Sequence, residues 1–253
     1  MSKDIPATEA RLDEARWIDR LPVGDGLGVM LDNQAEAIPA MRAALPAMEQ
    51  AVIAISGRLK SGVGRLVYAG AGTSARIGVQ DGAELLPTFD FPADRVAFVI
   101  AGGPAALLRP VENAEDSADA GTTKTDELAL GPNDCVLALA ASGHTIFTRA
   151  VVEVARSAGA LTIGISNNPD APLLDESEIA ITLDTGAEAL AGSTRLKAAT
   201  AQKICLNLIS TAVMVQLGHV KNGLMVSMVP RNEKLRRRKL KIEAQLEQDK
   251  SSQ

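Results

Sequence analysis

Residues 65–85 read RLVYAGAGTSARIGVQDGAEL and carry the pattern that decides the fold. Residues 65–69 are almost entirely apolar, which is typical of a strand that is buried on both faces. Small residues follow at 70–74, and the apolar positions then recur with the spacing of a helix. A strand, a glycine-rich turn and a helix in this order predict one unit of a parallel sheet covered by helices.

The same alternation recurs along the chain. Strands are predicted at residues 65–69, 95–100, 135–140, 161–165 and 178–181. Helices are predicted at 76–85, 124–130, 146–158 and 171–176, and a long helix at 194–217. We therefore expect an α/β fold with a doubly wound five-stranded parallel sheet in the flavodoxin-like order 2-1-3-4-5, and extra N- and C-terminal helices.

The 253 residues divide into three parts. Residues 1–59 form an N-terminal arm and helical segment, in which we expect residues 1–32 to be loosely ordered. Residues 60–222 form the α/β domain, and residues 223–253 form a C-terminal helical tail. The tail contains the basic run RRRK at 236–239, but acidic residues follow closely, so we interpret the run as a solvated helix face.

Composition excludes several classes of protein. The net charge of −5 and the 2% aromatic content give no reason to expect nucleic acid as a partner. The N-terminus has no apolar signal core, and the apolar stretch at 204–220 is too short and too polar for a membrane span, so it predicts a buried core helix. Cys135 and Cys205 are far apart and each lies in an apolar run, which indicates buried thiols in a reducing compartment. We expect a cytoplasmic protein without a membrane partner.

Two predicted strands end in nearly the same kind of turn. In GAGTS at 70–74 and ASGHT at 141–145, small and hydroxyl residues precede a helix. Helix N-termini offer free N–H groups and a positive dipole end, which suit a phosphate dianion. In the order 2-1-3-4-5 both turns face one crevice at the switch point. The candidate phosphate-binding residues are Gly72, Thr73, Ser74, Ser142, Gly143 and Thr145.

No nucleotide motif accompanies these turns. GAGTSA lacks the third glycine of the dinucleotide fingerprint, and the chain has no GxxxxGK[ST] motif. His144 and His219 have no nucleophile or second histidine beside them in the sequence, so we assign neither a catalytic role. No cofactor is expected.

Several longer segments resemble one family, the N-acetylmuramic acid 6-phosphate etherases, which belong to the phosphosugar-isomerase (SIS) superfamily. These segments are GAGTSARIGVQDGAELLPTF (70–89), IAGGPAALLRPVENAEDS (100–117), ASGHTIFTRAVVEVARSAGALTIGISNNP (141–169), AGSTRLKAATAQKICLNLISTA (191–212) and NEKL (232–235). The vertebrate glucokinase regulatory protein shares related segments. The resemblance makes residues 60–222 a SIS sugar-phosphate-binding domain.

The resemblance implies a reaction and roles for two carboxylates. The family cleaves the D-lactyl ether at C3 of the sugar by elimination and hydration, without a metal. By motif, Glu84 matches the acid that protonates the ether oxygen, and Glu115 matches the base that removes the C2 proton. The resemblance also implies a homodimer.

The position of Glu84 raises a geometric question. It lies ten residues beyond Ser74, or about 15 Å along an unbroken helix. Either the helix bends early, near Gly82 and Pro87, or Glu84 serves a site that is shared with a second subunit. We favour a site near the subunit interface.

The segment GSTRLK at 192–197 opens the long predicted helix, with Ser193 or Thr194 as its N-cap. Arg195 and Lys197 oppose the helix dipole in the first turn, so we expect an anion beside them, either the substrate or a nearby carboxylate. Ser193, Thr194, Arg195 and Lys197 are therefore candidate substrate-binding residues.

The chain departs from the family at several positions, which leave both glutamates and both turns in place. The family usually has glycine where this chain has Ala75 and Ala199, arginine where it has His144, and an acidic residue where it has Ser227. The family's helical domain after NEKL also has no counterpart in the sequence up to Gln253. Two alternatives to an etherase are a SIS phosphosugar isomerase and a non-enzymatic sugar-phosphate-binding regulator. The retention of Glu84 and Glu115 favours the etherase.

Overall fold

The computed structural model describes residues 6–230 and 233–251. Its centre is a five-stranded sheet in the order β2-β1-β3-β4-β5, and every neighbouring pair is parallel. The strands are β1 (Leu66–Gly70), β2 (Val96–Ile100), β3 (Cys135–Leu139), β4 (Leu161–Ser166) and β5 (Ile179–Thr182). The predicted fold class, strand order and strand positions are confirmed.

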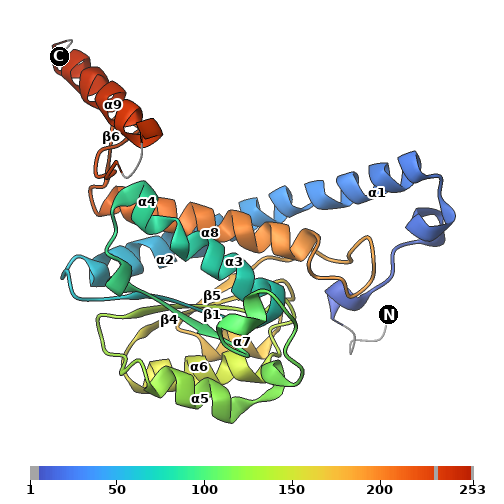
Figure 1. The fold of residues 1–253 in the computed structure, drawn as a ribbon. Helices are drawn as coiled ribbons and strands as arrows, with labels where there is room; N and C mark the ends of the chain where they lie inside the picture. The colour runs from blue at the N-terminus through green and yellow to red at the C-terminus, as the bar shows by residue number, and fades with distance from the viewer. Residues whose placement is uncertain (1–5, 231–232, 252–253) are drawn as a thin grey trace.

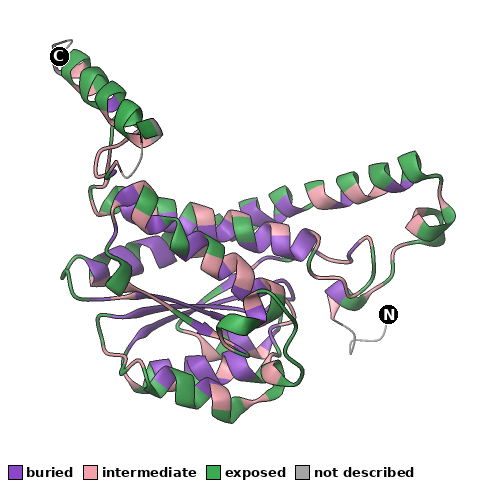
Figure 2. Cartoon of the chain, viewed as in Figure 1, coloured by how far each residue is buried: buried purple, intermediate pink, exposed green. Residues whose placement is uncertain are grey.

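Helices cover both faces of this sheet (Figure 1). One layer contains α2 (Ala37–Leu59), α3 (Gly72–Ala83), α4 (Leu85–Phe89) and α8 (Lys197–Gln216). The other layer contains α5 (Ala118–Asp126), α6 (Ile146–Ser157) and α7 (Pro172–Glu176). The strands between the two layers are largely buried, as their purple colour in Figure 2 shows.

Alternate strand residues supply the two halves of the core. Tyr68 and Leu137 belong to the cluster that includes α2 and α8, whereas Val67 and Val136 belong to the cluster that includes α6. Burial on both faces explains why these strands are continuously apolar rather than alternating. The scarcity of aromatic residues is compatible with this core because branched aliphatic side chains fill it.

The helix α8 is long and apolar enough to cross a membrane by length and composition, but more than half of its most apolar window is buried. Cys205, Leu206, Ile209 and Val213 are fully buried against the sheet layer. The prediction of a core helix at this position is confirmed. Burial also raises the pKa of both Cys135 and Cys205 to about 12, which keeps them as thiols.

The N-terminal part is more ordered than the sequence indicated. The expectation of a loosely ordered arm at 1–32 is wrong for its second half, because α1 (Val23–Ala35) begins directly after Pro22. Short 3-10 turns at Ala7–Glu9, Glu14–Arg16 and Ile18–Arg20 precede it. Gly26 packs closely on Ile18, with 3.5 Å between the position of a Cβ at Gly26 and the Ile18 carbonyl oxygen. The glycines that suggested a loop therefore lie within a helix, and Gly24 has open space around it.

The chain ends in a small hairpin, β6 (Val220–Lys221) and β7 (Leu224–Met225), followed by α9 (Glu233–Ser251). The predicted helical tail is present, and α9 stands apart from the sheet in Figure 1. Its basic run pairs locally, since Arg236 and Arg237 both contact Glu233. Asn232 of the NEKL stretch lies outside the described residues.

Candidate active site

Two glycine-rich turns meet at the carboxyl edge of the sheet. Strands β1 and β3 are direct neighbours, with Gly70 aligned to Leu139, so the turns that follow them leave the sheet side by side. The first turn enters α3 at Gly72, and the second enters α6 at Ile146. The structure thus brings together the two segments that the sequence singled out.

Glycine is required at two positions of these turns. Gly72 has φ +54° and Gly143 has φ +70°, a region in which other residues are strained. At Gly143 a Cβ atom would also lie 2.2 Å from the Cβ of Ala171 and 2.8 Å from Oγ of Ser166. The second turn therefore lies directly against the segment that follows β4.

Both helices that begin here lack a side-chain cap on their first turn. The first turn of a helix carries N–H groups without an intrahelical acceptor, so α3 and α6 both present free donors at the carboxyl edge of the sheet. Thr73, Ser142 and Thr145 are half-buried at the start of these helices, and Ser74 is 8% exposed. His144 is exposed, and its Nδ1 lies 2.9 Å from the Ser142 carbonyl oxygen. This arrangement can bind a phosphate through backbone donors and hydroxyls.

Glu115 lies near the same edge. It is exposed in a short 3-10 turn, Ala114–Asp116, within the segment that leaves the carboxyl end of β2. Arg76 of α3 secures this segment: its Nε donates to the Leu107 carbonyl at 3.1 Å, and its Nη2 donates to the Ala106 carbonyl at 2.9 Å. Sequence reasoning missed Arg76, although its place two residues after Ser74 is a usable signal.

Glu84 lies at the other end of α3. The helix runs unbroken from Gly72 to Ala83, which is about 18 Å, and the chain turns at Glu84 into α4. The alternative in which the helix bends before Glu84 is therefore wrong. In Figure 1, α4 lies at the end of α3 that is remote from the carboxyl edge. One chain thus places its two candidate catalytic glutamates in different regions.

Glu84 is exposed and lines a pocket of about 300 Å³ between α3, α4 and α8. Asp81 is buried in its floor and accepts three hydrogen bonds, from Tyr68 Oη (2.7 Å), Asn207 Nδ2 (2.6 Å) and Ser210 Oγ (3.1 Å). Burial beside this carboxylate raises the pKa of Tyr68 well above its ordinary value, so the phenol remains a donor. The network fixes α3 to β1 and to α8 one turn before Glu84.

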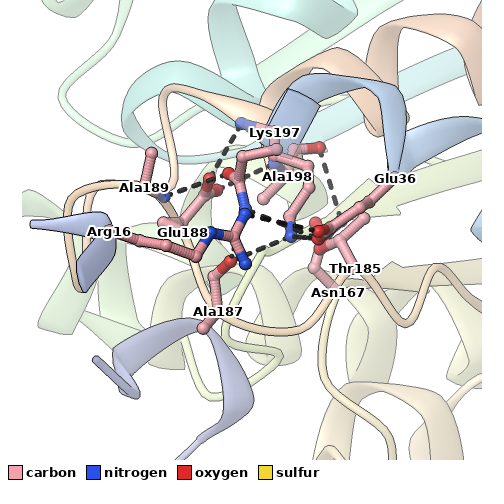
Figure 3. A network of polar contacts seen from close by, with 10 residues as sticks. Arg16, Glu36, Asn167, Thr185, Ala187, Glu188, Ala189, Lys197 and Ala198 are labelled. Atoms are coloured by element: carbon pink, nitrogen blue, oxygen red, sulfur yellow. Dashed lines mark hydrogen bonds and ion pairs between the residues drawn. The ribbon is translucent and has the colours of Figure 1, made fainter. Parts of the chain in front are cut away.

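The segment before α8 differs from its prediction. The helix begins at Lys197 with Leu196 as the N-cap residue, so neither Ser193 nor Thr194 caps it. The carboxylate of Glu188 takes this role, because its oxygens accept from the backbone N–H groups of Lys197 (2.9 Å) and Ala198 (2.8 Å) (Figure 3). A residue nine positions upstream replaces the local cap, which spacing alone does not reveal.

Lys197 itself is fully buried. Its Nζ pairs with Glu36 and donates to the Ala187 carbonyl at 2.9 Å, and Arg16 reaches the same Glu36 at 3.8 Å (Figure 3). We expected either the substrate or a nearby carboxylate beside Lys197, and the structure shows a carboxylate, that of Glu36. Arg195 is exposed just before the helix, as are parts of Ser193 and Thr194. Their contact with substrate stays a prediction.

The N-terminal arm contacts the residues that lie next to two groups of predicted site residues. Thr8 is buried: its N–H donates to Asn168 Oδ1 at 3.2 Å, and Asn168 Nδ2 donates to Thr8 Oγ1 at 3.1 Å and to the Ala141 carbonyl at 2.8 Å. The Thr8 carbonyl accepts from the Gly192 N–H at 2.9 Å. One turn of the arm therefore ties the second glycine-rich turn to the segment that carries Arg195.

Comparison with known proteins agrees with this geometry. Residues 47–153 match the glucokinase regulatory protein N-terminal SIS domain, and residues 111–212 match the SIS domain. A phosphoheptose isomerase from Francisella tularensis superposes with a TM-score of 0.58 at 20% identity, over 79% of this chain and 100% of that chain. The sugar isomerase domain of an RpiR transcription factor from Sphaerobacter thermophilus gives 0.54 at 16% identity, over 88% and 98%. The domain matches and the fold define a SIS-domain protein, a class that binds sugar phosphates.

The sequence relatives are more specific. The N-acetylmuramic acid 6-phosphate etherases of Rubrobacter xylanophilus and Cutibacterium acnes are each 45% identical, over 93% and 94% of this chain and 78% of each relative. The etherase of Deinococcus radiodurans is 46% identical over 86% of this chain and 71% of its own. The chain belongs to the N-acetylmuramic acid 6-phosphate etherase family. It is thus an etherase, a carbon–oxygen lyase, which supports the main prediction over the regulator and the isomerase.

Proposed function

We propose that this protein cleaves the D-lactyl ether of N-acetylmuramic acid 6-phosphate, giving N-acetylglucosamine 6-phosphate and D-lactate by elimination and hydration. The observation that carries the proposal is the 45% identity to etherases over almost the whole chain. The retention of Glu84 and Glu115 in their motifs supports it further. We place the reaction in the cytoplasm.

The sugar 6-phosphate is proposed to bind between the turns at Gly72–Ser74 and Ser142–Thr145. The free N–H groups at the N-termini of α3 and α6 can donate hydrogen bonds to the phosphate, and the positive ends of the helix dipoles favour its negative charge. The adjacent hydroxyl groups are further hydrogen-bond donors. Arg195, two residues before α8, is the exposed cation that we assign to the phosphate end of the substrate. Ser193 and Thr194 are also proposed to contact the substrate. Lys197 is not, because its ammonium group already pairs with Glu36.

Glu115 is the proposed base. In the open-chain sugar the C1 aldehyde acidifies the C2 proton, and Glu115 near the sheet edge removes it. The resulting enolate expels lactate from C3, and Glu84 protonates the departing ether oxygen. Water then adds to C3 of the enal, which restores the sugar with a hydroxyl in place of the lactyl ether.

A second copy of the chain is proposed to supply Glu84, so that the active unit is a homodimer. Two features support this assembly. Glu84 lies about 18 Å along α3 from the phosphate turn of its own chain. The projecting helix α1 also presents an apolar stripe to solvent, with Val23 81%, Leu27 58% and Leu31 71% exposed (Figures 1 and 2). Residues spaced by four share one helix face, and such a stripe fits burial against a partner.

The test is incubation with N-acetylmuramic acid 6-phosphate and an assay for D-lactate. We expect stoichiometric D-lactate and N-acetylglucosamine 6-phosphate. Binding of the substrate without lactate release would contradict the proposal and favour a sugar-phosphate-binding regulator. Light scattering under the same conditions tests the dimer, and a fully active monomer would refute the shared site.

A further inference from the structure

The pocket that contains Glu84 also contains a lysine that the proposed reaction has not used. Lys203 of α8 also lines this pocket, about 9 Å along α8 from its first residue. It therefore belongs to the region of Glu84 and lies away from the phosphate turns at the sheet edge. An exposed cation at this place is therefore available to an anion other than the phosphate.

No carboxylate within the described residues forms an ion pair with Lys203. Its Nζ donates to Oδ1 of Asn207 at 2.5 Å, which is a neutral acceptor. The amide of Asn207 donates on its other side to Asp81 at 2.6 Å, so the amide stands between the ammonium and the buried carboxylate. Asp81 is already satisfied by Tyr68 and Ser210. The ammonium keeps two of its three donors for a ligand.

The chemistry of the substrate supplies the matching anion. In a 3-O-lactyl ether, the ether oxygen and the carboxylate are bonded to the same carbon. An acid that reaches the ether oxygen therefore has the carboxylate within reach of its immediate neighbours. Lactate also leaves with developing negative charge on that oxygen, which a nearby cation stabilises.

We infer that Lys203 binds the lactyl carboxylate and thereby selects substrates that carry a carboxylate on the ether. The inference rests on the proposed function and deepens it. It makes the pocket between α3, α4 and α8 the binding site for the leaving group, with Glu84 as its acid, Lys203 as its cation and Asn207 as the residue that orients Lys203.

The test compares two ethers, N-acetylmuramic acid 6-phosphate and its lactamide analogue, in which a neutral carboxamide replaces the carboxylate. For Lys203→Met we expect kcat/KM to fall about 10- to 100-fold on the acid, the loss of one charge-assisted hydrogen bond. On the amide the change should stay within about threefold, because neutral ligands gain less from the cation. Lys203→Arg should retain most of the preference for the acid. Lys221→Met, which removes an exposed lysine of β6, is the matched control and should leave both rates unchanged.

An equal loss on both ethers in Lys203→Met would overturn the inference, as would unchanged rates on both. Thermal melting of each variant separates misfolding from loss of recognition. If the wild type binds both ethers but releases no lactate, the proposed function fails, and the dissociation constants then decide about Lys203. A wild-type preference for binding the acid that Lys203→Met abolishes would still support it, and an unchanged preference would refute it.

Discussion

The sheet edge near Glu115 and the pocket that holds Glu84 differ in what keeps their residues in place. At the edge, the backbone determines where the residues lie: β1 and β3 are buried throughout, and Gly72 and Gly143 adopt positive φ. At the pocket, side chains from three elements converge on Asp81. A single chain contains both regions but places them at opposite ends of α3.

The difference shows how one substrate can use two kinds of site. Backbone donors at helix N-termini suit the phosphate, whose shape and charge do not change during the reaction. A pocket of side chains suits the leaving group, where a proton must move and a charge must develop. Changes at one end should therefore affect binding of the sugar phosphate, and changes at the other should affect departure of lactate.

The largest effects are expected from the two glutamates. Glu115→Gln should reduce both C2 hydrogen exchange in deuterated water and lactate release by about 10²–10⁴, because no enolate forms without the base. Glu84→Gln should reduce lactate release by a similar factor but keep C2 exchange, because the proton leaves before lactate does. Deuterium incorporation into remaining substrate, measured beside lactate release, distinguishes the two.

The melting temperature of each variant is the control, since structural damage would lower both activities together. If Glu84→Gln abolished exchange while Glu115→Gln retained it, the two roles would be reversed. Normal lactate release by both variants would refute the mechanism.

Gly143→Ala should damage the phosphate end. The new Cβ would lie 2.2 Å from that of Ala171 at a φ of +70°, so the turn must shift or remain strained. Strain of this kind costs about 1–3 kcal/mol, and we expect N-acetylglucosamine 6-phosphate to bind about 10- to 100-fold more weakly. Gly57→Ala is the matched control: its site in α2 has open space, and alanine there should be neutral or stabilising. Calorimetric titration measures both, and unchanged affinity in Gly143→Ala would separate this turn from the ligand.

Tyr68→Phe should have the smallest effect and should act at the other end. It removes one of the three hydrogen bonds to Asp81, and Asn207 and Ser210 remain. We expect the free energy of unfolding to fall by about 1 kcal/mol, with the affinity for N-acetylglucosamine 6-phosphate unchanged. Denaturant titration and calorimetry provide the two readouts. A loss of sugar-phosphate affinity as large as that of Gly143→Ala would mean that the two ends are not independent.

Local patterns predicted the first region well. Apolar runs located the strands, and the turns after residues 69 and 140 carried their own glycines and hydroxyls. Parallel pairing then brought those turns together, since consecutive carboxyl ends share one edge of the sheet.

Side-chain contacts between residues far apart in the sequence could not be predicted from local patterns. Glu188 caps α8 from nine residues upstream, and Thr8 pairs with Asn168 from 160 residues away. Neither contact has a local spacing that could reveal it. The helix at Val23–Ala35 was missed because glycine has a low helix propensity, and Pro22, Gly24 and Gly26 together resemble a loop.

The central claim is that Glu84 of one chain and Glu115 of another complete one site, and mixing two inactive variants tests it most directly. Glu84→Gln and Glu115→Gln chains are unfolded together, refolded at equal amounts and assayed for D-lactate. A mixed dimer with a shared site has one site with both glutamates intact, so random pairing should restore about a quarter of wild-type activity. Each variant refolded alone should stay inactive. If the mixture also stays inactive while mass spectrometry detects mixed dimers, the two glutamates act within one chain and the account is contradicted.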